Sequence, residues 1–124
     1  MNTVRVNASK SYNIFIGREI LAELGHHVLS FGKVKTVCIV SETNVFPLFG
    51  KTVEESLKSA GFRTVSFVFP AGEESKCPKV YLELLNFLAE NHLTRTDLIV
   101  ALGGGVTGDL AGFAAATYLR GIRF

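Results

Sequence analysis

The chain has 124 residues, of which 48% are hydrophobic and 19% charged, and its formal net charge is +2 at pH 7. This length supports a single domain, residues 1–124, whose core needs neither disulfides nor a structural metal. The small net charge argues against a nucleic-acid partner, and no apolar stretch reaches the roughly 18 residues of a membrane-spanning helix. Two widely spaced cysteines fit a reducing compartment, so we expect a cytoplasmic protein that binds neither nucleic acid nor membrane.

The N-terminal third predicts a hairpin followed by a helix. Apolar and polar residues alternate on either side of residues 8–11, from Val4 to Val6 and from Tyr12 to Ile16. This pattern predicts an antiparallel β-hairpin with one solvated face. Apolar residues then recur at helical spacing over residues 18–31, which predicts a helix that ends at Gly32.

Strands and helices alternate through the rest of the chain. Short β-branched or apolar runs predict buried strands, and segments with helical spacing lie between them. This alternation predicts an α/β fold, Rossmann-like, with a mostly parallel sheet and helices on both faces, preceded by the N-terminal β-hairpin. The predicted strands are 36–40, 64–69 and 97–102, and the predicted helices are 46–60 and 78–92.

Three consecutive glycines follow the last of these strands and precede an Ala-rich helix. Without side chains on this turn, backbone N–H groups and the positive end of the helix can lie directly against an anion such as pyrophosphate. Gly103, Gly105 and Gly108 also satisfy Gly-x-Gly-x-x-Gly. The dinucleotide fingerprint, however, belongs to the first strand–helix unit of a sheet, and here at least three strands come earlier. A turn whose glycines only allow close helix packing is the alternative.

Three loops follow the carboxyl ends of the parallel strands, which is where ligands of such sheets bind. They span residues 41–44, 70–76 and 103–109. In the middle loop, the carboxylate of Glu73 can accept hydrogen bonds from ribose hydroxyls, and the ammonium of Lys76 can reach a phosphate. A solvated helix entrance explains the same two residues equally well.

Other polar residues near these loops also have two explanations. Asp109 stabilises the start of its helix and can also accept hydrogen bonds from ribose hydroxyls. Thr43 and Asn44 suit either the ligand site or the N-cap of the helix that follows them. The three histidines lack metal-ligand spacing with a neighbouring carboxylate or thiol, so we expect no metal site built from this chain alone.

The helix after the glycine turn is apolar on every face, from Ala111 to Leu119. One sheet covers only one side of a helix, so a further domain or subunit is expected to cover the rest. Gly121 can end the helix and Ile122 can begin another strand. We therefore expect the chain to be part of a longer protein and to associate when isolated.

Residues 103–124 (GGGVTGDLAGFAAATYLRGIRF) and 72–76 (GEESK) together resemble the N-terminal domain of the 3-dehydroquinate synthase family. The resemblance covers the whole chain but only the first part of a family member. It implies an NAD-binding domain of a homodimer, followed by a helical domain that supplies the zinc or cobalt ligands and most substrate contacts. It also implies that Arg120 binds the phosphate end of the substrate across a dimer interface. The plainer explanation of Arg120 is a cation that stabilises the C-terminus of its helix. The residues that it implies for NAD binding are Glu42, Thr43, Asn44, Gly72, Glu73, Glu74, Ser75, Lys76, Gly104, Gly105, Val106, Thr107, Gly108 and Asp109.

The family reaction implied by this resemblance converts a sugar phosphate, 3-deoxy-D-arabino-heptulosonate 7-phosphate, to 3-dehydroquinate and inorganic phosphate in the shikimate pathway. NAD acts catalytically in it, and the metal polarises the hydroxyl that is oxidised. Without the metal ligands, this chain alone is expected to be inactive. Ala71 and Cys77 depart from the family pattern, which often has Asp and then Ser or Thr there. The alternatives are a metal-dependent polyol or alcohol dehydrogenase, another sugar phosphate cyclase, and a non-catalytic nucleotide-binding module.

Overall fold

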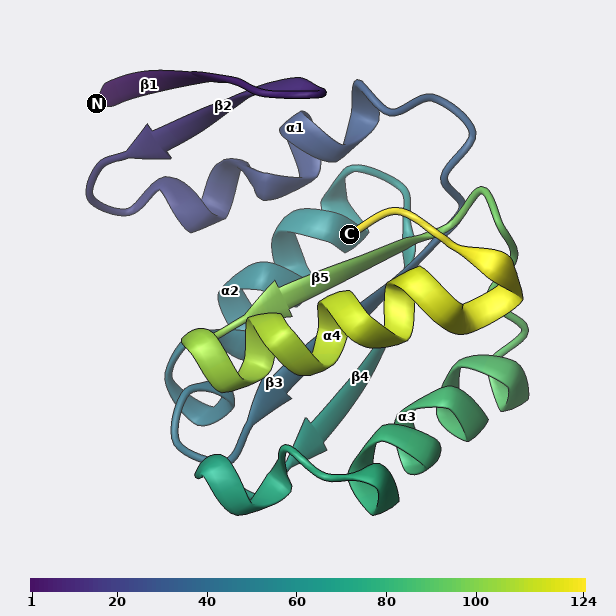
Figure 1. The fold of residues 1–124 in the computed structure, drawn as a ribbon. Helices are drawn as coiled ribbons and strands as arrows, with labels where there is room; N and C mark the ends of the chain where they lie inside the picture. The colour runs from purple at the N-terminus through teal and green to yellow at the C-terminus, as the bar shows by residue number, and fades with distance from the viewer.

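A three-stranded parallel sheet with the strand order β4–β3–β5 forms the centre of the structure (Figure 1). The computed structural model describes residues 1–124. The central strand, β3 (Thr36–Glu42), pairs with β4 (Arg63–Phe69) on one edge and with β5 (Leu98–Leu102) on the other. Six of its seven residues are buried, as expected for a strand that is covered on both faces. The predicted parallel sheet is confirmed.

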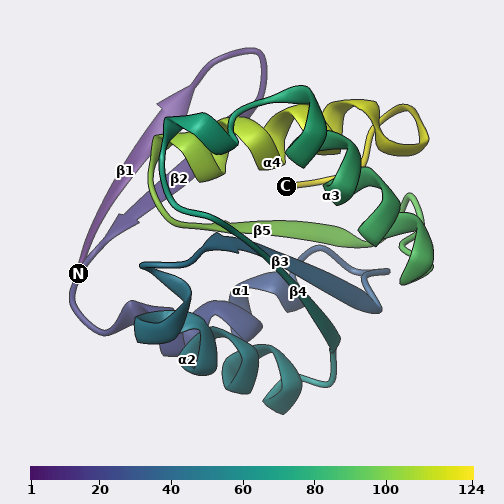
Figure 2. The same ribbon diagram turned by 90° about the horizontal axis from the view of Figure 1, so that it is seen from below.

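Two layers of helices enclose this sheet (Figure 2). Buried side chains of β3 alternate between them. Val37 and Ile39 belong to the apolar cluster beneath the first two helices, whereas Cys38 and Val40 belong to the cluster beneath the last two. The predicted cover on both faces is therefore confirmed. One layer contains α1 (Leu24–Leu29) and α2 (Phe46–Ser59), and the other contains α3 (Pro78–Glu90) and α4 (Gly105–Thr117).

A buried carboxylate aligns the amino ends of β3 and β5. Asp97, predicted as the first residue of a strand, instead precedes β5. Its Oδ1 accepts hydrogen bonds from the backbone N–H groups of Lys35 (3.1 Å) and Thr36 (2.9 Å). Its Oδ2 accepts from the N–H (2.8 Å) and the hydroxyl (3.1 Å) of Thr94. Burial alone raises the pKa of Asp97, but these hydrogen bonds outweigh burial and hold the pKa below its ordinary value.

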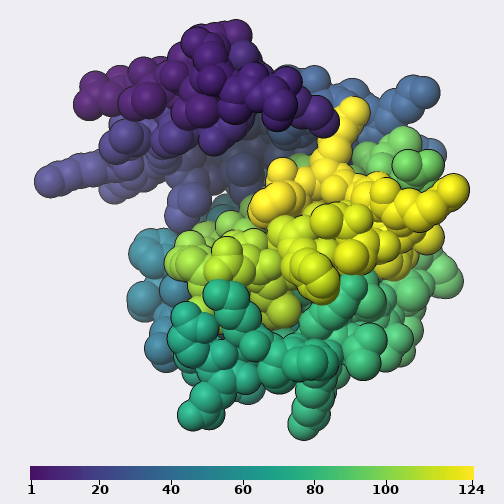
Figure 3. Space-filling view, in the orientation of Figure 1, coloured from purple at the N-terminus to yellow at the C-terminus, as the bar shows by residue number.

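The N-terminal hairpin, β1 (Asn2–Asn7) and β2 (Ser11–Ile16), is antiparallel as predicted. The expectation that one of its faces is buried was wrong, because Val4 is 46% exposed and Ile16 is 55% exposed. The physical reason is that the hairpin forms a sheet of its own, without hydrogen bonds to the three-stranded sheet. In the space-filling view it lies along one side of the molecule (Figure 3).

The first predicted helix is also shorter than its apolar pattern suggests. A 3₁₀ turn, η1 (Ile20–Glu23), occupies its first part, and only α1 is α-helical. Glu19, just before the turn, has a φ of 57°, a left-handed conformation that interrupts a regular helix.

The last residues turn back along the sheet. Two further 3₁₀ turns follow η1, namely η2 (Glu73–Ser75) and η3 (Tyr118–Arg120). After η3, the backbone N–H of Ile99 donates to the carbonyl of Arg123 (3.0 Å). Leu98 and Arg123 form a single parallel bridge, so the strand predicted to start at Ile122 is present only as this bridge. A cavity of about 490 Å³ runs beside β5, and 11 of its 12 lining residues are hydrophobic. None of the helices is both long and apolar enough to cross a membrane.

Candidate functional site

The loops that follow β3, β4 and β5 meet at one edge of the sheet, as predicted. They surround a cavity of about 180 Å³. Since parallel strands end at the same edge, residues far apart in the sequence become neighbours there. We call this cavity the glycine cavity, and its lining residues are Glu42, Val45, Phe69, Gly72, Gly104, Gly105, Val106 and Thr107.

The glycine turn leaves the amino end of α4 uncovered by side chains. Gly104 is the N-cap residue and α4 begins at Gly105. A Cβ atom added to either glycine would meet nothing within 4 Å. These two glycines therefore border open space, and close packing does not explain them. The N–H groups of the first helical turn and the positive end of the helix dipole are available to an anion.

Gly103 is different, because packing does explain it. Its φ is 157°, and an added Cβ would lie 2.6 Å from Oγ1 of Thr107. The side chain of Thr107 occupies the space that a larger residue at position 103 would need. The alternative explanation of the glycines as packing devices thus applies to this one position of the three.

Thr107 carries a buried hydroxyl without a hydrogen-bond partner. The residue is 1% exposed and lines the glycine cavity. Its Oγ1 is buried and has no hydrogen-bond partner in the structure. A buried unpaired hydroxyl costs about 1–3 kcal/mol, so an oxygen atom bound close to the turn would stabilise this arrangement.

Glu42 performs the capping role that had been considered for its neighbours. Its Oε1 accepts hydrogen bonds from the backbone N–H groups of Asn44 (3.1 Å) and Val45. The N-cap residue of α2 is Val45, whose own side chain makes no capping hydrogen bond. The N-cap explanation for Thr43 and Asn44 was therefore wrong. The carboxylate of Glu42 is held at the start of α2 and lines the glycine cavity.

Thr43 and Ser75 hold the loops in place. Oγ1 of Thr43 accepts a hydrogen bond from the N–H of Ala71 (3.0 Å), which joins the loop after β3 to the loop after β4. The buried hydroxyl of Ser75 donates to the carbonyl of Pro70 within the second loop. Glu74 and Asn44 are exposed and lie outside the lining of the cavity.

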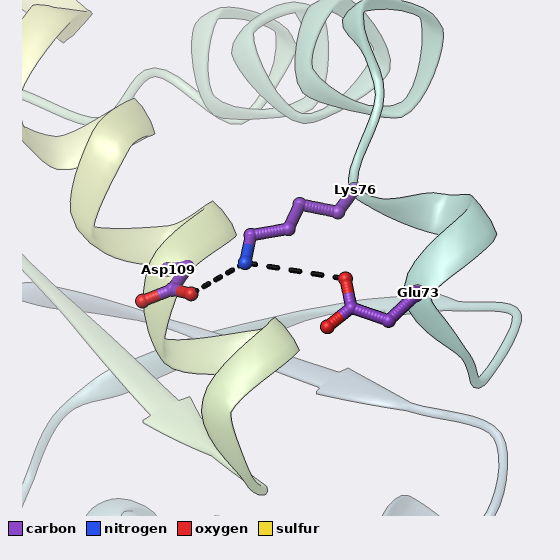
Figure 4. A network of polar contacts seen from close by, with 3 residues as sticks. All are labelled: Glu73, Lys76 and Asp109. Atoms are coloured by element: carbon purple, nitrogen blue, oxygen red, sulfur yellow. Dashed lines mark hydrogen bonds and ion pairs between the residues drawn. The ribbon is translucent and has the colours of Figure 1, made fainter.

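Lys76 links the middle loop to α4. Its Nζ lies 2.6 Å from Oδ2 of Asp109 and 4.0 Å from Oε2 of Glu73 (Figure 4). The hydrogen bond to Asp109 and the two negative charges raise the pKa of Lys76. The expected proximity of Glu73, Lys76 and Asp109 is thus present in the structure. In this state the ammonium contacts carboxylates and does not line the glycine cavity.

A second hollow beside this ion pair could not be predicted from the sequence. A cavity of about 500 Å³ lies between the first turn of α3 and the second and third turns of α4, next to Lys76 and Asp109. The rings of Tyr81 and Phe113, whose centroids are 4.9 Å apart, form part of its wall. Helical periodicity marks these aromatics only as apolar positions. It does not show that both line a hollow.

Arg120 lies away from the glycine cavity. It follows α4, whereas the glycine turn precedes this helix of 13 residues. A helix of this length spans about 20 Å, so the two sites lie at opposite ends of α4. The structure also contains no group of three or more His, Cys, Asp or Glu side chains that could hold a metal ion.

These features define the class of protein: a Rossmann-like α/β domain with an open helix N-terminus at the carboxyl edge of its sheet. Residues 66–124 match the family described as 3-dehydroquinate synthase N-terminal. Over 113 residues the chain is 47% identical to the 3-dehydroquinate synthase of Streptococcus suis (strain 05ZYH33). This aligned region covers 91% of this chain and 32% of that protein. The chain belongs to the 3-dehydroquinate synthase family, and it spans about one third of the length of these relatives.

Solved structures of two sugar-cyclising enzymes have the same fold. One is 2-deoxy-scyllo-inosose synthase in complex with carbaglucose-6-phosphate, NAD⁺ and Co²⁺, with a TM-score of 0.86 and 24% identity over 98% of this chain and 33% of that chain. The other is 2-epi-5-epi-valiolone synthase from Streptomyces hygroscopicus subsp. jinggangensis 5008 with NAD⁺ and Zn²⁺ bound. Its TM-score is 0.71, at 26% identity over 97% of this chain and 34% of that chain. The predicted fold class is confirmed.

Proposed function

We propose that residues 1–124 form the NAD-binding domain of a cytoplasmic, homodimeric 3-dehydroquinate synthase. The complete enzyme converts 3-deoxy-D-arabino-heptulosonate 7-phosphate to 3-dehydroquinate and phosphate, with zinc or cobalt as its metal. The observation that carries this proposal is the uncovered amino end of α4, which opens into the same cavity as Glu42 and Gly72.

The residues present fit a dinucleotide at this point. Open space above Gly104 and Gly105 leaves room for phosphate oxygens against the backbone N–H groups. The unpartnered hydroxyl of Thr107 lies under the same turn. Bound NAD supplies hydride acceptance at its nicotinamide ring, and the share of this chain is to hold and orient the cofactor.

The three loops divide the cofactor between them in this proposal. Backbone N–H groups of the α4 loop hold the pyrophosphate, and the carboxylate at the end of β3 accepts hydrogen bonds from a ribose. The middle loop closes over the cofactor through its charged side chains. The residues assigned in this way are Gly104, Gly105, Val106, Thr107, Gly108 and Asp109; Glu42, Thr43 and Asn44; and Gly72, Glu73, Glu74, Ser75 and Lys76.

The metal and the substrate require groups beyond the glycine cavity. Since no metal-binding group exists among these residues, the ligands come from the part of the enzyme that this chain does not span. Arg120 lies too far along α4 to serve the cavity of its own chain. Its proposed role in binding the substrate phosphate therefore belongs to the cavity of a second subunit.

The test is calorimetric titration of the chain with NAD, AMP and inorganic phosphate, together with a variant that blocks the turn. Gly105→Asp suits this purpose because position 105 has open space for a side chain, and a carboxylate at the first helical position stabilises the helix. The same carboxylate repels a pyrophosphate. We expect the variant to fold normally and to lose at least about tenfold in NAD affinity.

Asn13→Asp, on the exposed hairpin, is the matched control because it adds the same charge far from the turn. It should bind NAD as the unmodified chain does. Absence of NAD binding by the folded, unmodified chain would contradict the proposal. Equal affinity for AMP and NAD would favour a mononucleotide-binding module instead.

A further inference from the structure

The turn that follows α4 holds two consecutive residues in a left-handed backbone conformation. Leu119 has a φ of 49° and Arg120 a φ of 64°, and Gly121 after them has a φ of 117°. Glycine adopts such angles freely, whereas a residue with a Cβ atom does so at a cost. Leu119 and Arg120 are both exposed, so burial of their side chains does not offset this cost. Strain of this kind persists only where surrounding contacts fix the backbone, and it concentrates at functional sites.

Hydrogen bonds at both ends of this turn fix its conformation. At the start, the hydroxyl of Tyr118 donates to the carbonyl of Leu93 (2.7 Å), which fastens the turn to the segment between α3 and β5. At the end, the backbone N–H of Gly121 donates to the carbonyl of Tyr118 (2.8 Å), and the N–H of Ile122 donates to the carbonyl of Ala115 (2.8 Å). The turn is therefore tied to α4 and to a neighbouring segment, and these contacts keep it left-handed.

The side chain of Arg120 has no partner within the chain. It is exposed, and none of the three ion pairs of the structure includes it. Arg123 differs, because its Nη1 donates to the carbonyl of Phe31 (2.7 Å) and its guanidinium lies over the ring of that residue. The left-handed turn thus presents an unpaired guanidinium at the surface. Such a group suits a phosphate, to which it can donate two parallel hydrogen bonds.

From this arrangement we infer that Tyr118 and Leu119 are positioning residues for the binding of the sugar phosphate. The inference rests on the proposed function, in which Arg120 binds the substrate phosphate in the cavity of a second subunit. Tyr118 anchors the turn, and the left-handed conformation of Leu119 sets the direction in which Arg120 leaves the end of α4. An arginine whose backbone is fixed in advance loses less conformational freedom when it binds. The strained turn therefore increases the affinity for the substrate without touching it.

The experiment measures the KM for the sugar phosphate, the kcat and the dissociation constant of NAD in the complete enzyme. Three variants of the turn are compared, namely Leu119→Val, Leu119→Asn and Tyr118→Phe. Valine is strongly disfavoured at a positive φ because it branches at Cβ, whereas asparagine tolerates this conformation. Phenylalanine keeps the ring of Tyr118 and removes only the hydroxyl that donates to Leu93.

His92→Val is the matched control. His92 is exposed and also left-handed, with a φ of 59°, but it follows α3 and lies in a different turn from Arg120. A valine at this position imposes the same kind of backbone strain. It therefore separates a general loss of stability from a displaced arginine.

We expect Leu119→Val to raise the KM about tenfold, as for the loss of one charge-assisted hydrogen bond, with kcat and NAD affinity unchanged. Tyr118→Phe should raise the KM by a smaller factor, and Leu119→Asn should leave it nearly unchanged. His92→Val should lower the resistance to urea as Leu119→Val does, without a change in KM.

An unchanged KM in Tyr118→Phe and Leu119→Val, or an equal rise in His92→Val, would overturn the positioning role and leave the proposed function intact. A fall in kcat without a change in KM would also overturn it. If Leu119→Val does not fold, Tyr118→Phe alone decides between these outcomes. Failure of the unmodified enzyme to convert the sugar phosphate would instead overturn the proposed function, and this inference with it.

Discussion

Lys76 and Asp109 form an ion pair of 2.6 Å that joins the loop after β4 to the second turn of α4 (Figure 4). The two residues are 33 positions apart in the sequence, so the pair fixes how two of the three loops approach each other. Because the lysine is 43% exposed, water and salt weaken the pair, and we assign it a role in binding and only a small one in stability.

Replacing Lys76 by Gln should lower NAD affinity about tenfold while leaving the free energy of unfolding nearly unchanged. Calorimetry and urea denaturation measure the two quantities. Lys51→Gln removes another exposed ion pair, that with Glu55 on α2, and serves as the control. Equal loss of NAD affinity in both variants would show that net charge, and not the position of Lys76, is responsible.

Asp97→Asn should lower the free energy of unfolding at pH 7 by about 3 kcal/mol. The amide nitrogen that replaces Oδ2 is a donor, and it would face the N–H of Thr94, which is also a donor. The pKa of Asp97 lies below its ordinary value of 3.8 in the folded chain. Its stabilising contribution is thus complete above the unfolded pKa and is lost as the pH falls through the lower, folded pKa. Denaturation of the unmodified chain between pH 5 and about pH 2 should show this decline.

The same pH series on Asp97→Asn provides the check. The variant should show a smaller loss of stability in this window than the unmodified chain. Parallel curves for the unmodified chain and Asp97→Asn would exclude the carboxylate of Asp97 as the source.

Thr107→Val should leave the stability of the chain unchanged or raise it by up to about 1 kcal/mol, since it removes a buried hydroxyl that has no partner. It should also weaken NAD binding, because the hydroxyl becomes useful only when a ligand oxygen is present. Thr107→Ser keeps the hydroxyl and should bind NAD more tightly than the valine variant. Stability lost in Thr107→Val would mean that the hydroxyl already has a partner in the free chain.

The isolated chain should self-associate through apolar residues that its own fold leaves uncovered. Phe113 on α4 is 60% exposed and belongs to the helix that was predicted to need cover on all sides. Phe113→Lys should reduce the sedimentation-derived mass at high protein concentration and the binding of a hydrophobic dye. A monomer with low dye binding in the unmodified chain would refute this expectation.

The chain alone should release no phosphate from 3-deoxy-D-arabino-heptulosonate 7-phosphate when NAD and zinc are added. The reason is that it lacks a cluster of metal ligands. A phosphate-release assay with a complete 3-dehydroquinate synthase as positive control measures this outcome. Turnover by these residues would contradict the proposed division of the enzyme.

The order of strands and helices could be predicted from local patterns because each pattern reflects one physical requirement. The run of buried β-branched residues in β3 requires cover on both faces, and Pro78 is tolerated in a helix only in its first turn. The meeting of the three loops followed from the same source, since parallel strands share one carboxyl edge.

Details that depend on contacts between distant residues could not be predicted in this way. Local sequence does not show that Glu42, and not Thr43 or Asn44, accepts the N–H groups at the start of α2. It also does not distinguish Gly103, where Thr107 fills the space, from Gly104 and Gly105, which border open space. The hairpin was predicted correctly as local structure, but its burial depends on neighbours that an alternating pattern cannot specify.

The outer side of β5 is one of the two edges of the parallel sheet, and it bears on how the isolated domain behaves when it is heated. Beyond the hydrogen bond between Ile99 and Arg123, no strand pairs with this side, and an apolar hollow runs along it. A free strand edge of this kind is a template for any extended polypeptide, including partly unfolded copies of the same chain. Thermal denaturation should therefore end in irreversible, concentration-dependent aggregation, and a short extended segment placed along that edge should make the unfolding reversible.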